Sequence, residues 1–321
     1  MKSLCVVTPV FNDWISFAIL LKNLDKLASE TGLSIKVCAV DDGSSEPVEV
    51  LLDRLPRFQS LKAVDIVHLG VNIGHQRAIA VGLCTVVEQN ACEAVVVMDA
   101  DGEDMPEAIP RLLNAAKDSE SFCVVAQRRR RTEALVFRTS YILYKMLFLV
   151  VTGRKISFGN FSVMSISQAR RLTLVSELWN HLPSAILRSR IPITQVPVDR
   201  GYRYDGKSKM NFVSLIVHGL SGISVYADAI FVRLLLLSVI FAGGTVLAIF
   251  AVTALRFFMP QHATPGWATE VSFGMIILLS QIGLTALSSI LMLLNSRVQR
   301  QVLPRLDYKP YVLSIRNLFT N

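Results

Sequence analysis

Two long apolar runs near the carboxyl terminus constrain this chain of 321 residues most strongly. Residues 234–255 and 271–294 contain no charged side chain, and each run can cross a bilayer core of about 30 Å. The whole chain is apolar as well, with 52% hydrophobic residues and a mean hydropathy of +0.45. The alternative, a pair of buried helices in a soluble domain, is disfavoured because such long uncharged runs are uncommon there. We expect a two-helix transmembrane hairpin within residues 231–296.

The distribution of basic residues predicts the orientation of this hairpin. The loop 256–270 holds one arginine, whereas the tail 297–321 holds several basic residues: Arg297, Arg300, Arg305, Lys309 and Arg316. By the positive-inside rule, the tail and everything before the first span lie on the cytoplasmic side of the inner or plasma membrane. The first residues carry no signal-peptide pattern, and five isolated cysteines fit a reducing compartment.

The amino-terminal half alternates strand and helix patterns. Short apolar runs at 4–9, 35–40, 64–69 and 94–98 are separated by helix-like stretches around 16–29, 47–55 and 76–89. Such alternation predicts an α/β domain with a mainly parallel sheet that has helices on both faces. We expect this domain to occupy residues 1–210.

The strand at 94–98 runs directly into a cluster of carboxylates. Asp99 and Asp101 would point to the same side if the strand continued, and two such carboxylates can share one divalent ion with substrate phosphates. Ligands bind at the carboxyl edge of open α/β sheets. The alternative is an acidic turn that caps a helix starting near Pro106.

Polar residues also follow the other three strands. An aromatic ring and a carboxylate lie in segment 7–13, and an Asp-Asp-Gly turn lies in segment 40–45. Segment 72–78 begins a helix, whose first amides favour an anion. Each segment alone could be a plain turn or helix cap. Together they converge on one sheet edge.

Two basic segments fit phosphorylated or membrane partners. Four arginines at 128–131 precede an aromatic-rich stretch at 137–152, which is either an interfacial helix or a helix buried against the sheet. The segment 200–209 combines four basic residues with glycine and serine, which is typical of a flexible clamp for phosphates, although an exposed basic loop is the alternative. An amphipathic juxtamembrane helix is expected at 211–230.

These motifs resemble the family 2 glycosyltransferases of the GT-A fold. The strings are Val-x-Pro-x-Phe-Asn-Asp, Val-Asp-Asp-Gly-Ser-Ser, Asn-x-Gly-His-Gln-x-Ala and Met-Asp-Ala-Asp-Gly-Glu-Asp. The similar group is the polyprenyl-phosphate sugar transferases, which includes dolichol-phosphate mannose synthase and bactoprenol glucosyltransferase. The resemblance implies an inverting hexosyltransferase that uses Mg²⁺ or Mn²⁺, a UDP- or GDP-linked sugar and a polyprenyl phosphate. It also implies a homo-oligomer, such as a tetramer.

The resemblance assigns roles to particular residues. The residues expected to bind the nucleotide sugar are Pro9, Phe11, Asp13, Asp41, Asp42, Gly74 and Asp99. The expected metal ligands are Asp99, Asp101 and Glu103. The expected catalytic residues are Asp101, Asn160, Arg203 and Lys209, and those for the lipid phosphate are Arg128, Arg131, Arg200 and Ser208.

Two positions depart from the family pattern. Glu103 stands where the family commonly has Gln, and Asn160 stands where it has a candidate base, Asp. An amide cannot act as a base at neutral pH. A phosphate monoester acceptor is already anionic, because its second pKa is about 6. Either no base is needed, or Asp101, Glu103 or Asp104 serves.

Other functions fit less well. A processive polysaccharide synthase of the same fold would carry a Gln-x-x-Arg-Trp motif, which this sequence lacks. An inactive scaffold would not need the retained acidic and basic motifs. The formal charge of +8 points to anionic lipid headgroups and phosphorylated substrates, since no nucleic-acid-binding motif accompanies it.

Overall fold

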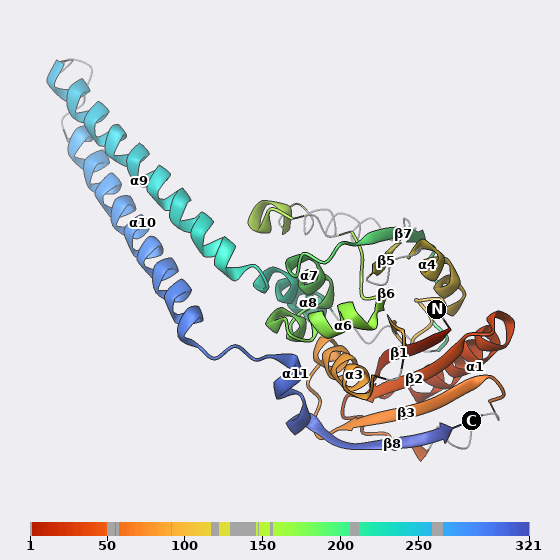
Figure 1. Ribbon diagram of the computed structural model, residues 1–321. Coiled ribbons are helices and arrows are strands. Elements are labelled where there is room, and N and C mark those ends of the chain that lie inside the picture. Colours follow the sequence, from red (N-terminus) through yellow and green to blue (C-terminus); the bar gives the residue numbers. More distant parts are fainter. Residues whose placement is uncertain are drawn as a thin grey trace. The chain divides into compact units, whose positions relative to one another are not determined.

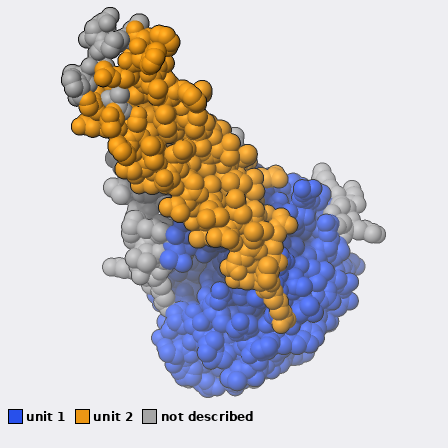
Figure 2. Space-filling model, turned by 90° about the vertical axis from the view of Figure 1, so that its left-hand side faces the viewer, with its two compact units in different colours: residues 1–145, 155–225, 301–321 blue, residues 146–154, 226–300 orange. Residues whose placement is uncertain are grey.

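The computed structural model describes residues 2–49, 55, 58–90, 92–116, 122–128, 146, 148–154, 157–205, 212–258 and 266–320. The chain divides into two compact units, which Figure 2 colours separately. The first unit comprises Met1–Lys145, Lys155–Val225 and Gln301–Asn321, and the second comprises Met146–Arg154 and Tyr226–Arg300.

The first unit contains an eight-stranded sheet (Figure 1). In sheet order the strands are β7 (Thr194–Val198), β5 (Cys123–Arg128), β6 (Ser162–Ser165), β4 (Ala94–Val97), β1 (Ser3–Val10), β2 (Ser34–Asp41), β3 (Leu61–Leu69) and β8 (Val312–Thr320). Strands β4, β1, β2 and β3 are parallel, as are β5 and β7, whereas β6 and β8 run antiparallel to their neighbours. The predicted mainly parallel sheet is confirmed.

Helices cover both faces of this sheet. The helical segments of the first unit are α1 (Trp14–Thr31), α3 (His75–Gln89), η1 (Pro106–Ala108), α4 (Ile109–Ala115), α6 (Ile166–Leu172), η2 (Ser176–Trp179), α7 (Leu182–Arg188), α8 (Phe212–Ser224), α11 (Pro304–Asp307) and η4 (Lys309–Tyr311). Side chains of α1 and α4 pack on one face, and those of α3, α6 and α7 pack on the other. Because β1 alternates its side chains, Val6 enters the first core and Val7 the second. The isolated cysteines are all buried.

The carboxyl-terminal strand is a feature that the sequence analysis did not foresee. β8 pairs antiparallel with β3, more than two hundred residues earlier in the chain. Asn317 Nδ2 donates a hydrogen bond to Asp65 Oδ1 at 2.7 Å, and the ring of Phe319 packs edge-on against Phe58 at 5.6 Å. The tail that follows the second apolar helix therefore completes the sheet of the first unit.

The second unit contains the two long apolar helices. α9 spans Ala227–Phe258 and α10 spans Trp267–Val298, and both are long and apolar enough to cross a membrane. Only 17% and 6% of their most apolar windows are buried, so neither is a core helix in this structure. Arg233 Nη1 at the start of α9 donates to the carbonyl oxygens of Val150 and Val151 at 2.9 and 2.8 Å. Of the expected interfacial segment 137–152, residues 137–145 and 147 lie outside the described part, and 148–152 are helical.

Candidate active site

The site forms where β1, β2, β3 and β4 end at the same edge of the sheet. Parallel strands bring their carboxyl ends together, so the loops after these strands are neighbours. β4 ends at Val97, which places Asp99 and Asp101 in a turn and not on a continuing strand. The continuing strand on which the expected alternation depended is therefore absent after Val97.

Hydrogen bonds within residues 99–104, which we call the acidic turn, hold its shape. The carboxylate of Asp104, which is 3% exposed, accepts a hydrogen bond from the backbone N–H of Asp99 at 3.1 Å. Asp101 Oδ1 accepts one from the backbone N–H of Glu103 at 3.0 Å. Gly102 has a φ of +91°, a conformation that favours glycine. Asp104 is thus a structural residue of the turn.

The basic residues after β7 lie against the acidic turn. In the segment 199–204, which we call the arginine loop, the N–H of Gly201 donates to Glu103 O at 3.0 Å and that of Tyr204 donates to Asp101 O at 2.9 Å. A side chain at Gly201 would collide with the carbonyl oxygen of Gly102. The two glycines allow the two backbones to touch.

Ion pairs join the same two segments. Arg203 Nη2 lies 3.1 Å from Asp101 Oδ2 and 4.0 Å from Asp13 Oδ2, and Arg200 pairs with Glu103. Burial lowers the pKa of the Arg200 guanidinium, and the carboxylates of Asp101 and Asp99 oppose this shift. The structure thus brings the two predicted arginines of the arginine loop to predicted acidic residues, Arg200 to Glu103 and Arg203 to Asp101.

A chain of side-chain amides reaches the acidic turn from the other side. The backbone N–H of Leu182 donates to Gln76 Oε1 at 2.8 Å, which leaves Gln76 Nε2 to donate to Asn160 Oδ1 at 3.1 Å. Asn160 Nδ2 then faces His75 Nε2 at 3.1 Å, and this nitrogen lies 3.2 Å from Asp99 Oδ1. The backbone donor of Leu182 therefore fixes which way the Asn160 amide points.

His75 and Gln76 are site residues that sequence reasoning missed. Burial alone would lower the pKa of His75, but the carboxylates of Asp99, Asp42 and Asp101 shift it upward overall. Both residues stand in the Asn-x-Gly-His-Gln motif, from which only Gly74 was selected.

The start of α3 already has an anion of its own. Asp42 Oδ1 accepts the N–H of Ile73 at 2.8 Å, and Asp42 Oδ2 accepts that of Gly74 at 3.0 Å. Burial raises the pKa of Asp42, although these two hydrogen bonds oppose the shift. Two of the amides expected to attract a substrate anion, those of Ile73 and Gly74, therefore already donate to Asp42.

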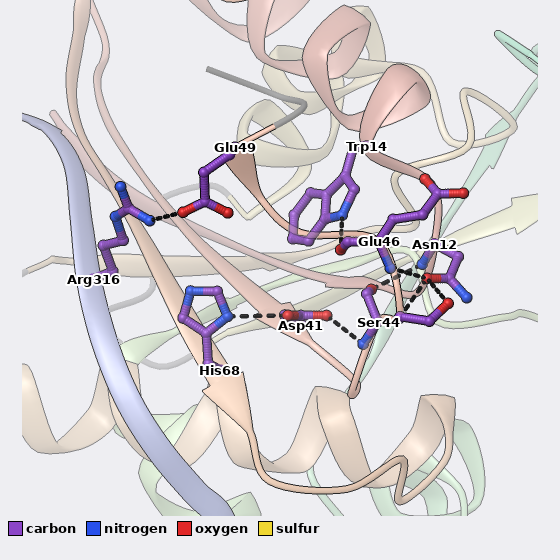
Figure 3. A network of polar contacts seen from close by, with 9 residues as sticks. Asn12, Trp14, Asp41, Ser44, Glu46, Glu49, His68 and Arg316 are labelled. Carbon is purple, nitrogen blue, oxygen red and sulfur yellow. Dashed lines mark hydrogen bonds and ion pairs between the residues drawn. The ribbon is translucent and has the colours of Figure 1, made fainter. Parts of the chain in front are cut away.

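Hydrogen bonds connect the loop after β1 with the loop after β2, which follows Asp41 (Figure 3). Asn12 Oδ1 accepts the backbone N–H of Ser45 at 2.8 Å, and Ser44 Oγ accepts that of Asn12 at 2.9 Å. These bonds tie the loops after β1 and β2 together. The ring of Phe11 beside them is 43% exposed, so it can contact a ligand.

The acidic turn fits a divalent ion only if substrate completes the coordination. The described residues contain no group of three His, Cys, Asp or Glu side chains that could hold a metal ion by themselves. Asp99 and Asp101 do offer hard carboxylate oxygens, and Mg²⁺ typically binds one or two carboxylates plus substrate phosphates and water. The donor set fits a metal–diphosphate complex. Glu103, the third expected ligand, pairs with Arg200 in this structure.

Two more of the predicted residues lie on strands of the sheet. Arg128 is the last residue of β5, and Pro9 on β1 lies in register with Val40 on β2. Arg131, Ser208 and Lys209 lie outside the described residues.

Sequence comparison identifies the class of protein that carries this acidic turn and arginine loop. Residues 5–177 match the glycosyl transferase family 2 model, which covers more than half of the chain. The chain belongs to glycosyl transferase family 2. It is 28% identical, over 281 residues, to the undecaprenyl-phosphate 4-deoxy-4-formamido-L-arabinose transferases of Salmonella paratyphi B and Salmonella newport, covering 85% of this chain and 81% of each relative.

Solved structures share the fold. Glucosyl-3-phosphoglycerate synthase from Mycobacterium tuberculosis, crystallised with Mn²⁺, UDP-glucose and phosphoglyceric acid, superposes with a TM-score of 0.50 at 14% identity, covering 71% of this chain and 80% of that one. Mannosyl-3-phosphoglycerate synthase from Rubrobacter xylanophilus also gives 0.50 at 14% identity, covering 70% and 73%. The predicted GT-A fold is confirmed.

Proposed function

We propose that this glycosyltransferase moves one sugar from a nucleotide diphosphate sugar to a polyprenyl phosphate, with inversion, at the cytoplasmic face of a membrane. The observation that carries the proposal is the contact between the acidic turn and the arginine loop at the sheet edge. The two long apolar helices of the same chain support a lipid acceptor.

The donor half of the reaction uses the loops after β1, β2 and β4. Phe11, Asp13 and Asp41 are proposed to contact the nucleoside. Asp99 and Asp101 would hold Mg²⁺ or Mn²⁺, with Glu103 as a third candidate. Bound there, the ion would neutralise charge on the departing nucleoside diphosphate. The solved relative with Mn²⁺ and UDP-glucose supports this assignment at the level of the fold.

On the acceptor side, the enzyme must neutralise phosphate charge more than it must remove a proton from the acceptor. A phosphate monoester is anionic near neutral pH and can attack the sugar carbon directly, so displacement in one step inverts that carbon. Arg200 and Arg203 are proposed to bind the phosphates of donor and acceptor, with Arg128, Arg131, Ser208 and Lys209 as further candidates for these phosphates. Asn160 is held by Gln76 and is proposed to orient substrate by hydrogen bonding.

The membrane half of the proposal rests on the hairpin and its basic flank. Residues 1–210, whose sheet β8 completes, form the proposed catalytic domain, and α9 and α10 form its anchor. The sequence relatives act, by their names, on undecaprenyl phosphate, which is a lipid of this kind. The excess of basic residues in the tail favours the cytoplasmic orientation.

The test is a search for the lipid product. The purified full chain is incubated with undecaprenyl phosphate and a panel of UDP- and GDP-sugars, with Mg²⁺ or Mn²⁺, and the lipids are weighed by mass spectrometry. The proposal predicts one glycosylated lipid phosphate, with a mass gain of a single sugar. Polymer growth, or no lipid product with any donor, would contradict it.

A further inference from the structure

The carboxylate of Asp41 is held from two directions at the end of β2. The backbone N–H of Ser44 donates to Oδ1 at 2.9 Å, and His68 Nδ1 lies 3.0 Å from Oδ2 (Figure 3). Asp41 is 7% exposed. An ionised carboxylate only accepts hydrogen bonds, so Nδ1 is the donor of this pair.

His68 occupies a fixed place in the sheet. It pairs in register with Asp41 on β2 and with Ser314 on β8, so the three residues form a row across three strands. The β3–β8 pairing shifts register between His68 and Leu69, and irregularities of this kind re-aim side chains. The strand that follows the membrane hairpin thus flanks His68.

A second contact lies on the same flank of the sheet. Arg316 Nη1 on β8 lies 2.7 Å from Glu49 Oε1, in the segment that follows the Asp41 turn (Figure 3). Both side chains are largely exposed, so we expect the pair to add little stability by itself. The pair does connect β8 to the segment that follows Ser44.

Two fixed donors leave a carboxylate with defined directions for any further hydrogen bond. Each carboxylate oxygen can accept more than one bond, so Asp41 can still accept a donor from a ligand. Uracil and guanine present a ring N–H to such an acceptor. Cytosine and adenine present an unprotonated ring nitrogen at the matching position, which a carboxylate repels.

We propose that His68 is a positioning residue for the donor nucleotide, which acts by orienting the Asp41 carboxylate toward a ring N–H of the base. This inference rests on the proposed function, because it takes Asp41 as a nucleoside contact. It adds a residue on β3 and the flanking strand β8 to the machinery of base selection.

The test compares nucleotide selectivity, which a purely structural histidine would not change. Dissociation constants of UDP, GDP, CDP and ADP are measured by calorimetry with Mg²⁺ present, on the full-length protein in detergent. The variants are His68→Leu, which removes the donor, and His68→Asn, whose side-chain N–H replaces Nδ1–H.

Asp65→Asn serves as the matched control. Asp65 is also on β3 and also links β2 to β8, through Lys36 Nζ at 2.8 Å and Asn317 Nδ2 at 2.7 Å, but it lies three residues before His68. A general loosening of this flank should appear in both Asp65→Asn and His68→Leu, and melting temperatures record it.

Wild type is expected to prefer UDP or GDP over CDP and ADP. His68→Leu should reduce this preference about tenfold, in line with the loss of a hydrogen bond to a charged group. His68→Asn should restore most of it, and Asp65→Asn should keep the wild-type ratio.

Two results would overturn the inference. A His68→Leu protein that loses affinity equally for all four nucleotides would make the histidine merely structural, and one that keeps all four wild-type affinities would remove it from base selection. A wild-type protein that binds none of the four nucleotides would refute the proposed function itself, so the two failures are distinguishable.

Discussion

Arg203 and Asp101 form an ion pair, with Nη2 of the arginine 3.1 Å from Oδ2 of the carboxylate, at the contact between the arginine loop and the acidic turn. Each charge is therefore balanced within the protein. A metal-bound diphosphate offers both residues new partners, since it supplies a cation for the carboxylate and anions for the guanidinium.

The first prediction concerns Asp101. Asp101→Asn keeps the size of the side chain but removes the charge that pairs with Arg203 and that we propose for metal binding. We expect transfer to fall by at least about a hundredfold, because charge stabilisation at the reacting phosphates is lost. Turnover is measured on the lipid product, and Mn²⁺ affinity by paramagnetic resonance. Unchanged turnover would remove Asp101 from the catalytic machinery.

The second prediction concerns the backbone contact of the two loops. In Gly201→Ala the added Cβ meets Gly102 O, so the arginine loop must move away from the acidic turn. We expect transfer to fall by roughly tenfold or more, because a misplacement of about 1 Å can cost a hundredfold. Gly70→Ala is the control, since nothing lies within 4 Å of a Cβ there. Equal activity in both variants would show that the loop contact is dispensable.

The third prediction concerns the amide chain on α3. Gln76→Leu leaves the Leu182 N–H without its acceptor and frees the Asn160 amide to rotate. Stability should fall by about 1–3 kcal/mol, because a buried donor loses its partner, and turnover should fall as well. Thr85→Val removes a different buried hydrogen bond of the same helix, from Thr85 Oγ1 to Val81 O, and should leave turnover intact. Equal turnover losses in the two variants would show that Gln76→Leu lowers turnover only by destabilising the helix.

The fourth prediction concerns thiol reactivity. Burial raises the pKa of the Cys84 thiol to about 12. At pH 9 only about one such thiol in a thousand is ionised, whereas most cysteines of an unfolded chain are, since their pKa is about 8.5. Iodoacetamide should therefore leave Cys84 unmodified in the native protein between pH 7 and 9 and modify it after unfolding, as mass spectrometry would record. Rapid native alkylation would contradict the buried placement.

The sheet and the meeting of its loops were predictable because they follow from local patterns. Apolar strands that alternate with helices imply a parallel sheet, and parallel strands end at one edge. The end of β4 at Val97 was harder to place, because just beyond it the N–H of Asp99 donates to the Asp104 carboxylate. Hydropathy cannot reveal such a bond.

Two other features could not be predicted from the sequence, for a different reason. The pairing of β8 with β3 joins segments far apart in the chain, and no periodicity specifies a partner at that separation. The Leu182–Gln76–Asn160 chain likewise depends on a backbone N–H that only the folded structure brings to α3. The roles of Gln76 and His75 emerge only from these contacts.

The measurement that tests the central claim most directly is a comparison of acceptors. The purified full chain and its Asp101→Asn variant are given a radiolabelled nucleotide sugar with either undecaprenyl phosphate or 3-phosphoglycerate, since phosphoglyceric acid is bound in one solved relative of the same fold. We predict label in the lipid fraction for the wild type alone, and none in 3-phosphoglycerate. Transfer to the soluble acceptor, or equal lipid labelling by both proteins, would contradict the account.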